Sequence, residues 1–285
     1  MNQPPEGTVF VAPKWRDLGV RTLSAAVLIP IVVLDVWVGG AWFDLMVALL
    51  AVMMAHEWTN MAHERRSSQF AVHATSGLCG VALPLGAGLM PALIAIAVLT
   101  AAAVLIDKQR DGPFSQWTFA GVPYIGLAAG ALILLRHDSA AGVAAIIWLF
   151  AVVWAADTLA FFGGRVIGGP KLAPAISPNK TWAGLFGALA GGLLAGAAAG
   201  WCLGYQSLSV LAGIGAVLAL IEQGGDLFES ALKRHFGTKD SGRLIPGHGG
   251  ILDRVDGLVA AAIAAAAIGI VHSGSQSAGA GLLVW

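Results

Sequence analysis

Residues 233–257, KRHFGTKDSGRLIPGHGGILDRVDG, contain side chains whose types and spacing could do chemistry. They hold eight of the charged side chains of a chain that is 57% hydrophobic. Asp253 and Asp256 lie three residues apart, so both carboxylates fall in the first turns if a helix begins near Leu252. Proteins bind Mg²⁺ through one or two carboxylates, leaving other positions to water and phosphate. The spacing therefore predicts a cation site.

The same stretch supplies donors for phosphate. Lys239, Arg243, Arg254 and His248 can donate to phosphate oxygens, and an arginine can bind two oxygens at once. Glycines around His248 allow the backbone to approach a ligand closely. Acids for a cation and bases for phosphate thus occur together.

An acidic stripe precedes this stretch. Glu222, Asp226, Glu229 and Lys233 are spaced four, three and four residues apart, which places them on one face of a helix. The pattern suits a cation site at a membrane surface. A solvated helix end would explain Glu229, but it explains Asp226 poorly because the segment continues an apolar run.

A second polar loop, GGRVIGGPKLAPAISPNKTWAG, covers residues 163–184. Its SPNKT segment contains Ser177, Asn179 and Lys180 just before a predicted helix, where anions are favoured. Asp157 precedes the loop by about a turn and a half, and it either contributes to a site or pairs with Arg165.

The elements that must position these residues are membrane helices. The mean hydropathy is +0.78 and 11% of residues are charged, against about 25% in soluble domains. Apolar runs of about 17 to 23 residues match the length of a helix that crosses a bilayer, and helices satisfy their own backbone hydrogen bonds in lipid. We predict an all-α integral membrane protein, a polytopic bundle of about nine transmembrane helices with cytoplasmic active-site loops. The predicted spans are 19–39, 41–61, 71–87, 89–106, 118–135, 141–163, 181–203, 208–225 and 256–272.

Basic residues predict the orientation. With the N-terminus in the cytoplasm, all lysines and arginines except Arg136 fall on the cytoplasmic side, as the positive-inside rule requires. We predict a cytoplasmic arm (1–18), a transmembrane scaffold (19–140), a catalytic transmembrane region (141–273) and a loose C-terminal tail (274–285). The catalytic region includes cytoplasmic loops 164–180 and 233–255. Glu57 lies near the cytoplasmic end of its span and could support the polar site.

Other classes of protein fit less well. The net charge is zero, so nothing favours nucleic acid, and the chain lacks a Walker-type phosphate loop. The DRVDG segment resembles the start of the CDP-alcohol phosphotransferase motif, but the rest of that motif is missing. The loops therefore favour phosphoryl or nucleotidyl transfer on a lipid at the cytoplasmic membrane surface.

Residues 230–256, SALKRHFGTKDSGRLIPGHGGILDRVD, closely resemble the signature of phosphatidate cytidylyltransferases, also called CDP-diacylglycerol synthases. That pattern reads S-x-hydrophobic-K-R, four residues, K-D, a glycine-containing spacer, H-G-G and x-D-R-x-D. The segment DTLAFFGGRVIGGPKLAPAISPNKTWAG also resembles the family's earlier motif, although Ala183 replaces a frequent Glu or Gln. The resemblance covers about a third of the chain.

The resemblance implies the reaction of CTP with phosphatidate to give CDP-diacylglycerol and pyrophosphate in phospholipid biosynthesis. It also implies Mg²⁺, with a monovalent cation such as K⁺ as a companion ion, and a location in the inner membrane of a bacterium. Our hypothesis gives the metal to Asp226 and Asp253, with Asp256 as third ligand or support. Lys239, Arg254, Lys180 and Ser177 would hold phosphate groups, with Asn179 beside them.

The remaining roles are less sharply defined. Asp240 would orient Lys239, whereas Lys233 and Arg234 would contact lipid headgroups, and His248 is a phosphate donor or a structural residue. Asp157 and Glu57 would support the site from outside. Two alternatives stay open: a related CTP-dependent transferase for another lipid phosphate, and an ion-coupled transporter. The sequence does not determine the oligomeric state, and a homodimer is one of the states it allows.

Overall fold

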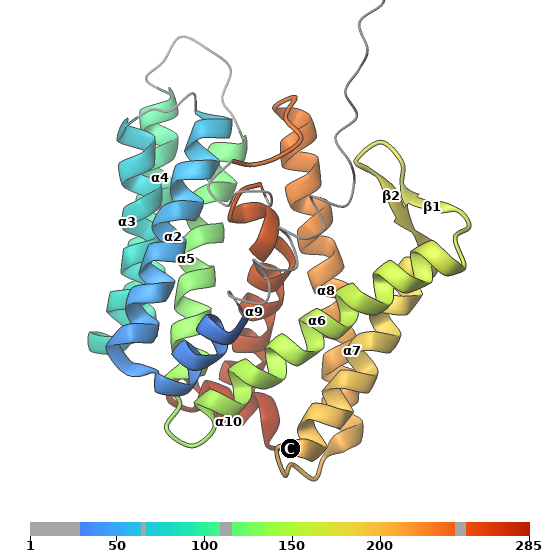
Figure 1. Ribbon diagram of the computed structural model, residues 1–285. Helices are drawn as coiled ribbons and strands as arrows, with labels where there is room; N and C mark the ends of the chain where they lie inside the picture. The colour runs from blue at the N-terminus through green and yellow to red at the C-terminus, as the bar shows by residue number, and fades with distance from the viewer. Residues whose placement is uncertain (1–28, 64–66, 109–115, 243–248) are drawn as a thin grey trace, which may run out of the picture.

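The computed structural model describes residues 29–63, 67–108, 116–242 and 249–285, and these are almost entirely helical. Figure 1 shows the order of the elements along the chain. The helices after the short Ile29–Val38 are α2 (Gly40–Ala62), α3 (Ser67–Gly86), α4 (Leu89–Lys108), α5 (Gln116–Arg136), α6 (Gly142–Val166), α7 (Trp182–Cys202), α8 (Leu208–His235), α9 (Leu252–Ser273) and α10 (Ala278–Leu283), with a 3₁₀ turn at Ser275–Ser277.

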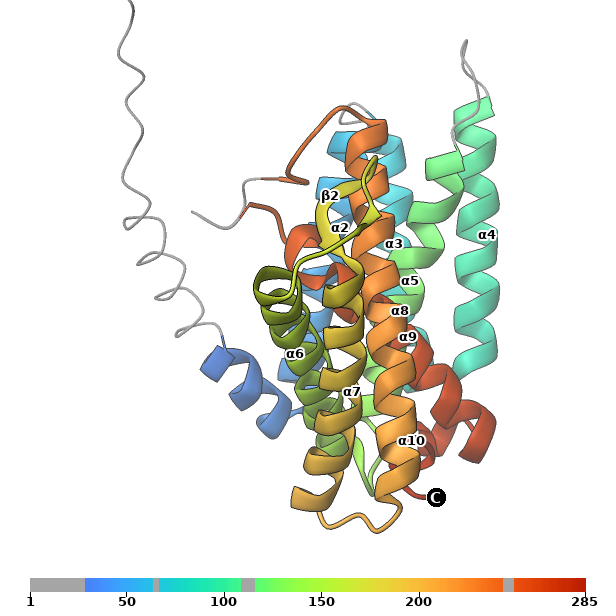
Figure 2. The ribbon, with the colours of Figure 1, turned by 90° about the vertical axis from the view of Figure 1, so that its right-hand side faces the viewer.

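The helices form two groups joined by α9. Helices α2 to α5 pack together, α7 packs between α6 and α8, and α9 contacts both α5 and α8. The strands β1 (Lys171–Ala173) and β2 (Ser177–Thr181) form an antiparallel hairpin between α6 and α7. Figures 1 and 2 place this hairpin at the same end of the bundle as the C-terminal ends of α2, α4 and α8. The segments predicted to carry the site therefore meet at one end, which we call the polar end.

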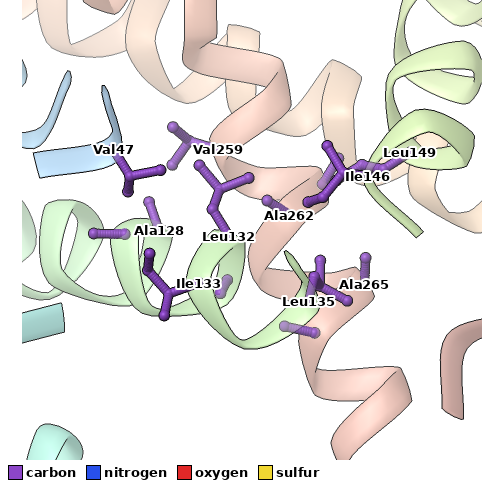
Figure 3. Close-up of a cluster of buried hydrophobic side chains, with 14 of the residues drawn as sticks. Val47, Ala128, Leu132, Ile133, Leu135, Ile146, Leu149, Val259, Ala262 and Ala265 are labelled. Carbon is purple, nitrogen blue, oxygen red and sulfur yellow. The ribbon is translucent and has the colours of Figure 1, made fainter. Parts of the chain in front are cut away.

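The apolar core lies where α5, α6 and α9 meet. Figure 3 shows Leu132 and Leu135 of α5 beside Ala262 and Ala265 of α9, with Ile146 of α6 near them. Leu135, Ile146 and Ala262 are completely buried. Lipid tails are as apolar as these side chains, so close packing, rather than escape from water, stabilises this core.

Glycines allow α7 to lie very close to both of its neighbours. A Cβ on Gly187 would clash with the backbone oxygen of Leu159 in α6. On the other face, Gly192 and Gly215 of α8 each lie against the other's backbone oxygen. Small residues at such crossings are typical of membrane helix pairs. The Gly- and Ala-rich composition of α7 is thus explained by packing.

The helices match the predicted spans closely, with some differences in length. Seven helices in the described part of the chain are long and apolar enough to cross a membrane. The predicted third span corresponds to α3, which is a helix but is not among the seven, and the first is described only from Ile29 onward. Nine spans therefore stay a prediction, while the all-α polytopic fold is confirmed.

One local prediction was wrong, and one element was not anticipated. The tail was predicted to be loose, but it forms a short helix, and Leu282 and Leu283 are fully buried because α10 packs on α9. The 164–180 loop contains a hairpin that the sequence analysis did not anticipate. In addition, α8 continues beyond residue 225 to His235, so the acidic stripe lies on one unbroken helix as predicted.

The close approach of α7 and α8 predicts the effect of adding one methyl group. Gly215→Ala should lower the midpoint of thermal unfolding in detergent, because overpacking costs about 1–3 kcal/mol. Gly213→Ala is the matched control, since it lies on the same helix with open space around it. It should be neutral or slightly stabilising, because alanine favours helices. Equal midpoints for the two variants would contradict this account of the crossing.

Candidate active site

A buried carboxylate from α2 caps the N-terminus of α9. Glu57 is only 1% exposed, and its Oε1 accepts from the backbone N–H of Ile251 at 2.9 Å. Its Oε2 accepts from the N–H of Leu252 at 2.8 Å and from the Ser241 hydroxyl at 3.1 Å. The first N–H groups of a helix lack partners within the helix and carry partial positive charge, so an anion there is favourable. Glu57 thereby fixes where α9 begins.

Asp253, in the first turn of α9, also accepts hydrogen bonds at this helix end. Its Oδ2 accepts from the N–H groups of Gly250 and Ser241, both at 2.9 Å, and from the Ser241 hydroxyl at 3.0 Å. Its Oδ1 forms an ion pair of 2.7 Å with Lys233 of α8. Lys233 also pairs with the buried Glu229. Asp253 and Lys233 therefore hold the start of α9, the end of α8 and Ser241 together.

A polar cavity of about 640 Å³ lies beside this cluster, between α6, β2, α7 and α8. Its charged lining residues are Asp157 and Arg165 of α6, Lys180 of β2 and Asp226 of α8. Ser177 and Asn179 of β2 also line it. The cavity therefore brings the SPNKT segment together with Asp226 of the acidic stripe.

Lys180 joins the hairpin to α8. Its Nζ lies 2.8 Å from Asp226 Oδ2 and donates to the Gln223 side-chain oxygen at 2.9 Å. The carboxyl groups of Asp157 and Glu222 are electrostatic neighbours, and Asp157 forms no ion pair with Arg165 in the described part of the chain. Carboxylates this close repel one another, so a positive charge near them would be favourable.

Asp256 lies between the cavity and the α9 cap. Its Oδ1 accepts from the N–H of Gly257 at 2.9 Å, and its backbone oxygen accepts from Tyr124 at 3.2 Å. It is within electrostatic range of Asp226, Lys233 and Asp157. A Cβ on Gly225 would meet the Asp256 backbone oxygen at 2.7 Å, so α8 and α9 approach closely here.

The oxygen-rich surroundings suit a hard divalent cation, but the predicted ligands do not form a ready-made cage. Within the described ranges, no three Asp, Glu, His or Cys side chains are close enough together to hold a metal. Asp226 and Asp256 are electrostatic neighbours, whereas Asp253 is bound to Lys233 and Ser241. Mg²⁺ usually relies on few carboxylates and on substrate phosphates, so the donor set fits. The exact ligand set stays a prediction.

The other predicted residues lie around these two groups. Lys239 and Asp240 are exposed and form no ion pair with each other, although both belong to the described chain. Arg254 lies in the first turn of α9 and is exposed. Arg234 donates to the backbone oxygen of Ile176 at 3.3 Å. Arg234 therefore supports the hairpin. His248 and Arg243 lie outside the described residues.

Three features escaped the sequence analysis. Gln223 holds Lys180, Ser241 links Glu57 with Asp253, and Arg165 lines the cavity. Glu229 was placed in the acidic stripe, with a solvated helix end as the alternative. That alternative is wrong for Glu229, which is 1% exposed and pairs with Lys233 inside the bundle. Lys233 was predicted to contact headgroups, yet here it is held between two carboxylates.

Comparison with known proteins places the chain among enzymes. A model of the cytidylyltransferase family matches residues 19–271, which is most of the sequence. The chain belongs to the cytidylyltransferase family. A protein named phosphatidate cytidylyltransferase from Brucella abortus biovar 1 (strain 9-941) is 44% identical over 258 residues, covering 86% of this chain and 91% of the relative. A protein of the same name from Staphylococcus haemolyticus (strain JCSC1435) is 35% identical over 246 residues, covering 83% and 93%.

Membership of this family agrees with the two motifs from which the resemblance was inferred. The described residues of both motifs lie at the polar end of the bundle, on α6, β2, α8 and α9 and beside them. The match also extends over α2 to α5, for which the sequence analysis had only hydropathy.

Removing one acceptor from the α9 cap should weaken the whole site. In Glu57→Gln one side-chain oxygen becomes an NH₂ group, so at least one of the N–H groups that Glu57 binds loses its partner. A buried unsatisfied donor costs about 1–3 kcal/mol. We therefore expect a lower midpoint of thermal unfolding, together with reduced turnover.

The control is His56→Gln, at the exposed neighbouring position on α2. It should leave the unfolding midpoint unchanged. A Glu57→Gln midpoint equal to that of the wild type would show that α9 does not depend on this cap.

Proposed function

We propose that the protein transfers the cytidylyl group of CTP to phosphatidate, giving CDP-diacylglycerol and pyrophosphate. The observation that carries the proposal is the cavity in which Lys180 of the SPNKT segment meets Asp226 of α8, in a chain of this family. Relatives that cover most of the chain are named phosphatidate cytidylyltransferase.

The chemistry demands positioning more than proton transfer. A phosphate oxygen of the lipid attacks the α-phosphorus of CTP, a new P–O bond forms, and the bond to pyrophosphate breaks. The attacking oxygen is already anionic, so no strong general base is required. The barrier comes from bringing two polyanions together, and fixed positive groups lower it.

The cavity lining can be divided by task. Lys180, Ser177 and Asn179 would hold phosphate oxygens, because they lie together on β2 along one wall. Lys239 and Arg254 would bind phosphate from the segment before α9 and from its first turn, and Asp240 would orient Lys239. His248 would donate to phosphate from the same segment. Asp157, across the cavity on α6, would support the acids of α8.

Asp226, Asp253 and Asp256 would hold Mg²⁺, with K⁺ as a proposed companion ion. When bound, the ion would neutralise phosphate charge and orient the leaving pyrophosphate. Asp253 would take part only by exchanging its bond to Lys233. The pairing of Lys180 with Asp226 would likewise loosen as Lys180 turns to phosphate.

We further propose that the protein lies in the inner membrane with the polar end facing the cytoplasm, where CTP is made. The apolar helices and the distribution of basic residues support this orientation. The acyl chains of phosphatidate would stay in the bilayer while its headgroup reaches the cavity. A homodimer stays a prediction.

Purified protein should release pyrophosphate only when CTP, Mg²⁺ and phosphatidate are all present. Parallel reactions with diacylglycerol and with undecaprenyl phosphate should give none, because the first lacks the phosphate nucleophile and the second has a different lipid body. Turnover of undecaprenyl phosphate alone would overturn the proposed substrate. Asp226→Asn should lower kcat by about a hundredfold or more, as expected for loss of charge stabilisation.

Asp44→Asn is the matched control for this experiment. It makes the same chemical change at the opposite end of the bundle, where Asp44 pairs with His137 at 2.6 Å. It should keep near-normal turnover. An Asp226→Asn protein that is folded and equally active would contradict the role of Asp226.

The proposed orientation can be tested by cysteine labelling in intact cells. After Cys202 is replaced by serine, Lys171→Cys in the exposed hairpin should resist a membrane-impermeant maleimide until the cells are opened. Ser139→Cys, in the turn between α5 and α6 at the other end, should react from outside. The reverse pattern would place the site outside the cytoplasm.

A further inference from the structure

The cavity contains two cations with different surroundings. Lys180 forms an ion pair with Asp226 and a hydrogen bond with Gln223. Arg165 lines the same cavity, but it forms no ion pair with any carboxylate in the described part of the chain. Its guanidinium group is therefore available to an anionic ligand, whereas the charge of Lys180 is already balanced.

Arg165 is held in place by an aromatic ring. Its guanidinium carbon lies 5.6 Å from the centre of the Phe161 ring, within the range of a cation–π contact. Phe161 also lines the cavity. A cation–π contact uses none of the guanidinium N–H groups as hydrogen-bond donors to another side chain, so they can bind two oxygens of one phosphate. The contact thus orients a donor group without using its donors.

The spacing on α6 explains why these residues share a wall. Asp157, Phe161 and Arg165 are each four residues apart, so they follow one face of the helix, and all three line the cavity. The next residues along, Phe162 and Val166, are 54% and 79% exposed. In a helix that meets the membrane, such apolar side chains face lipid.

The first turns of α7 carry a matching apolar surface. Trp182 and Phe186 are 47% and 63% exposed, with ring centres 6.4 Å apart. An available guanidinium at a polar cavity, bordered by membrane-facing aromatic side chains, matches an amphiphile. A lipid monophosphate has this chemistry, because its phosphate is joined directly to apolar chains. CTP lacks the apolar part.

We propose that Arg165, held by Phe161, binds the phosphate of the lipid substrate at the membrane-facing side of the cavity. This proposal rests on the proposed function and adds to it a residue that discriminates between the two substrates. Arg165 then sets the KM for the lipid, while the groups on β2 and α8 act on the nucleotide.

The test measures each KM separately in nonionic-detergent micelles in which phosphatidate is the one anionic lipid. Arg165→Gln should raise the KM for phosphatidate about tenfold, as expected for the loss of a hydrogen bond to a charged group. The KM for CTP should change less than about twofold. Arg165→Lys should fall between wild type and Arg165→Gln, because it keeps the charge but loses the planar pair of donors.

Lys108→Gln is the matched control. Lys108 lies in the last turn of α4 at the polar end, as Arg165 lies in the last turn of α6, but it is outside the cavity. Its removal should leave both KM values unchanged. Equal increases in the KM for phosphatidate in the two variants would show general attraction to the micelle surface and would overturn the proposal.

The remaining outcomes are also decisive. A wild type that is active, with an unchanged KM for phosphatidate in folded Arg165→Gln, would overturn this inference alone. A wild type without phosphatidate-dependent pyrophosphate release would overturn the proposed function and the inference with it. If Arg165→Gln does not fold, Phe161→Leu decides: an increased KM for phosphatidate supports the proposal, and an unchanged one contradicts it.

Discussion

The arrangement of helices at the polar end depends on how the N-terminus of α9 is capped. This N-terminus is closed by two carboxylates, Glu57 from α2 and Asp253 from α9 itself. Removing a carboxylate from water costs free energy, so each of these two anions needs compensating partners. Each finds backbone N–H groups, and Asp253 also finds Lys233. Helix α2, the end of α8 and the start of α9 are thereby held in one arrangement, with Asp256 placed one turn further along.

The arrangement leaves more carboxylates than cations near the cavity. Lys233 lies between Glu229 and Asp253, and Lys180 pairs with Asp226. Asp157, Glu222 and Asp256 are additional acids in the same region. Carboxylates this close repel one another in a medium of low dielectric constant, so protons or bound cations must balance them. A divalent ion that arrives with a nucleotide would supply this balance only when substrate is present.

The sequence was sufficient to predict what depends on local pattern. The helices, the start of α9 at Leu252 and the continuous face from Glu222 to Lys233 follow from hydropathy and from spacing along the helix. The partners of those residues depend on how distant helices pack, and a single sequence does not contain that information. Sequence spacing could not reveal that Lys233 would turn inward to Asp253, or that Glu57, nearly 200 residues away, would cap α9. The buried tail was missed because six residues of Ala, Gly and Leu are too short for a hydropathy signal.

The α6 wall shows where local pattern and packing combine. Asp157, Phe161 and Arg165 follow a spacing that the sequence displays, but a spacing of four residues does not say whether that face meets lipid, protein or a cavity. The packing of α6 against α7 determines what this face meets. Gly184 and Gly187 of α7 allow the backbones of the two helices to come into contact. Residues of the hairpin and of α8 form the other walls of the cavity next to that contact. One wall of the cavity thus contains an acid near the carboxylates of α8 and a guanidinium group that contacts the Phe161 ring and forms no ion pair in the described part of the chain. Asp157 and Arg165 lie about two helical turns apart, so the acid can act with the carboxylates of α8 while the guanidinium group stays available to a substrate phosphate.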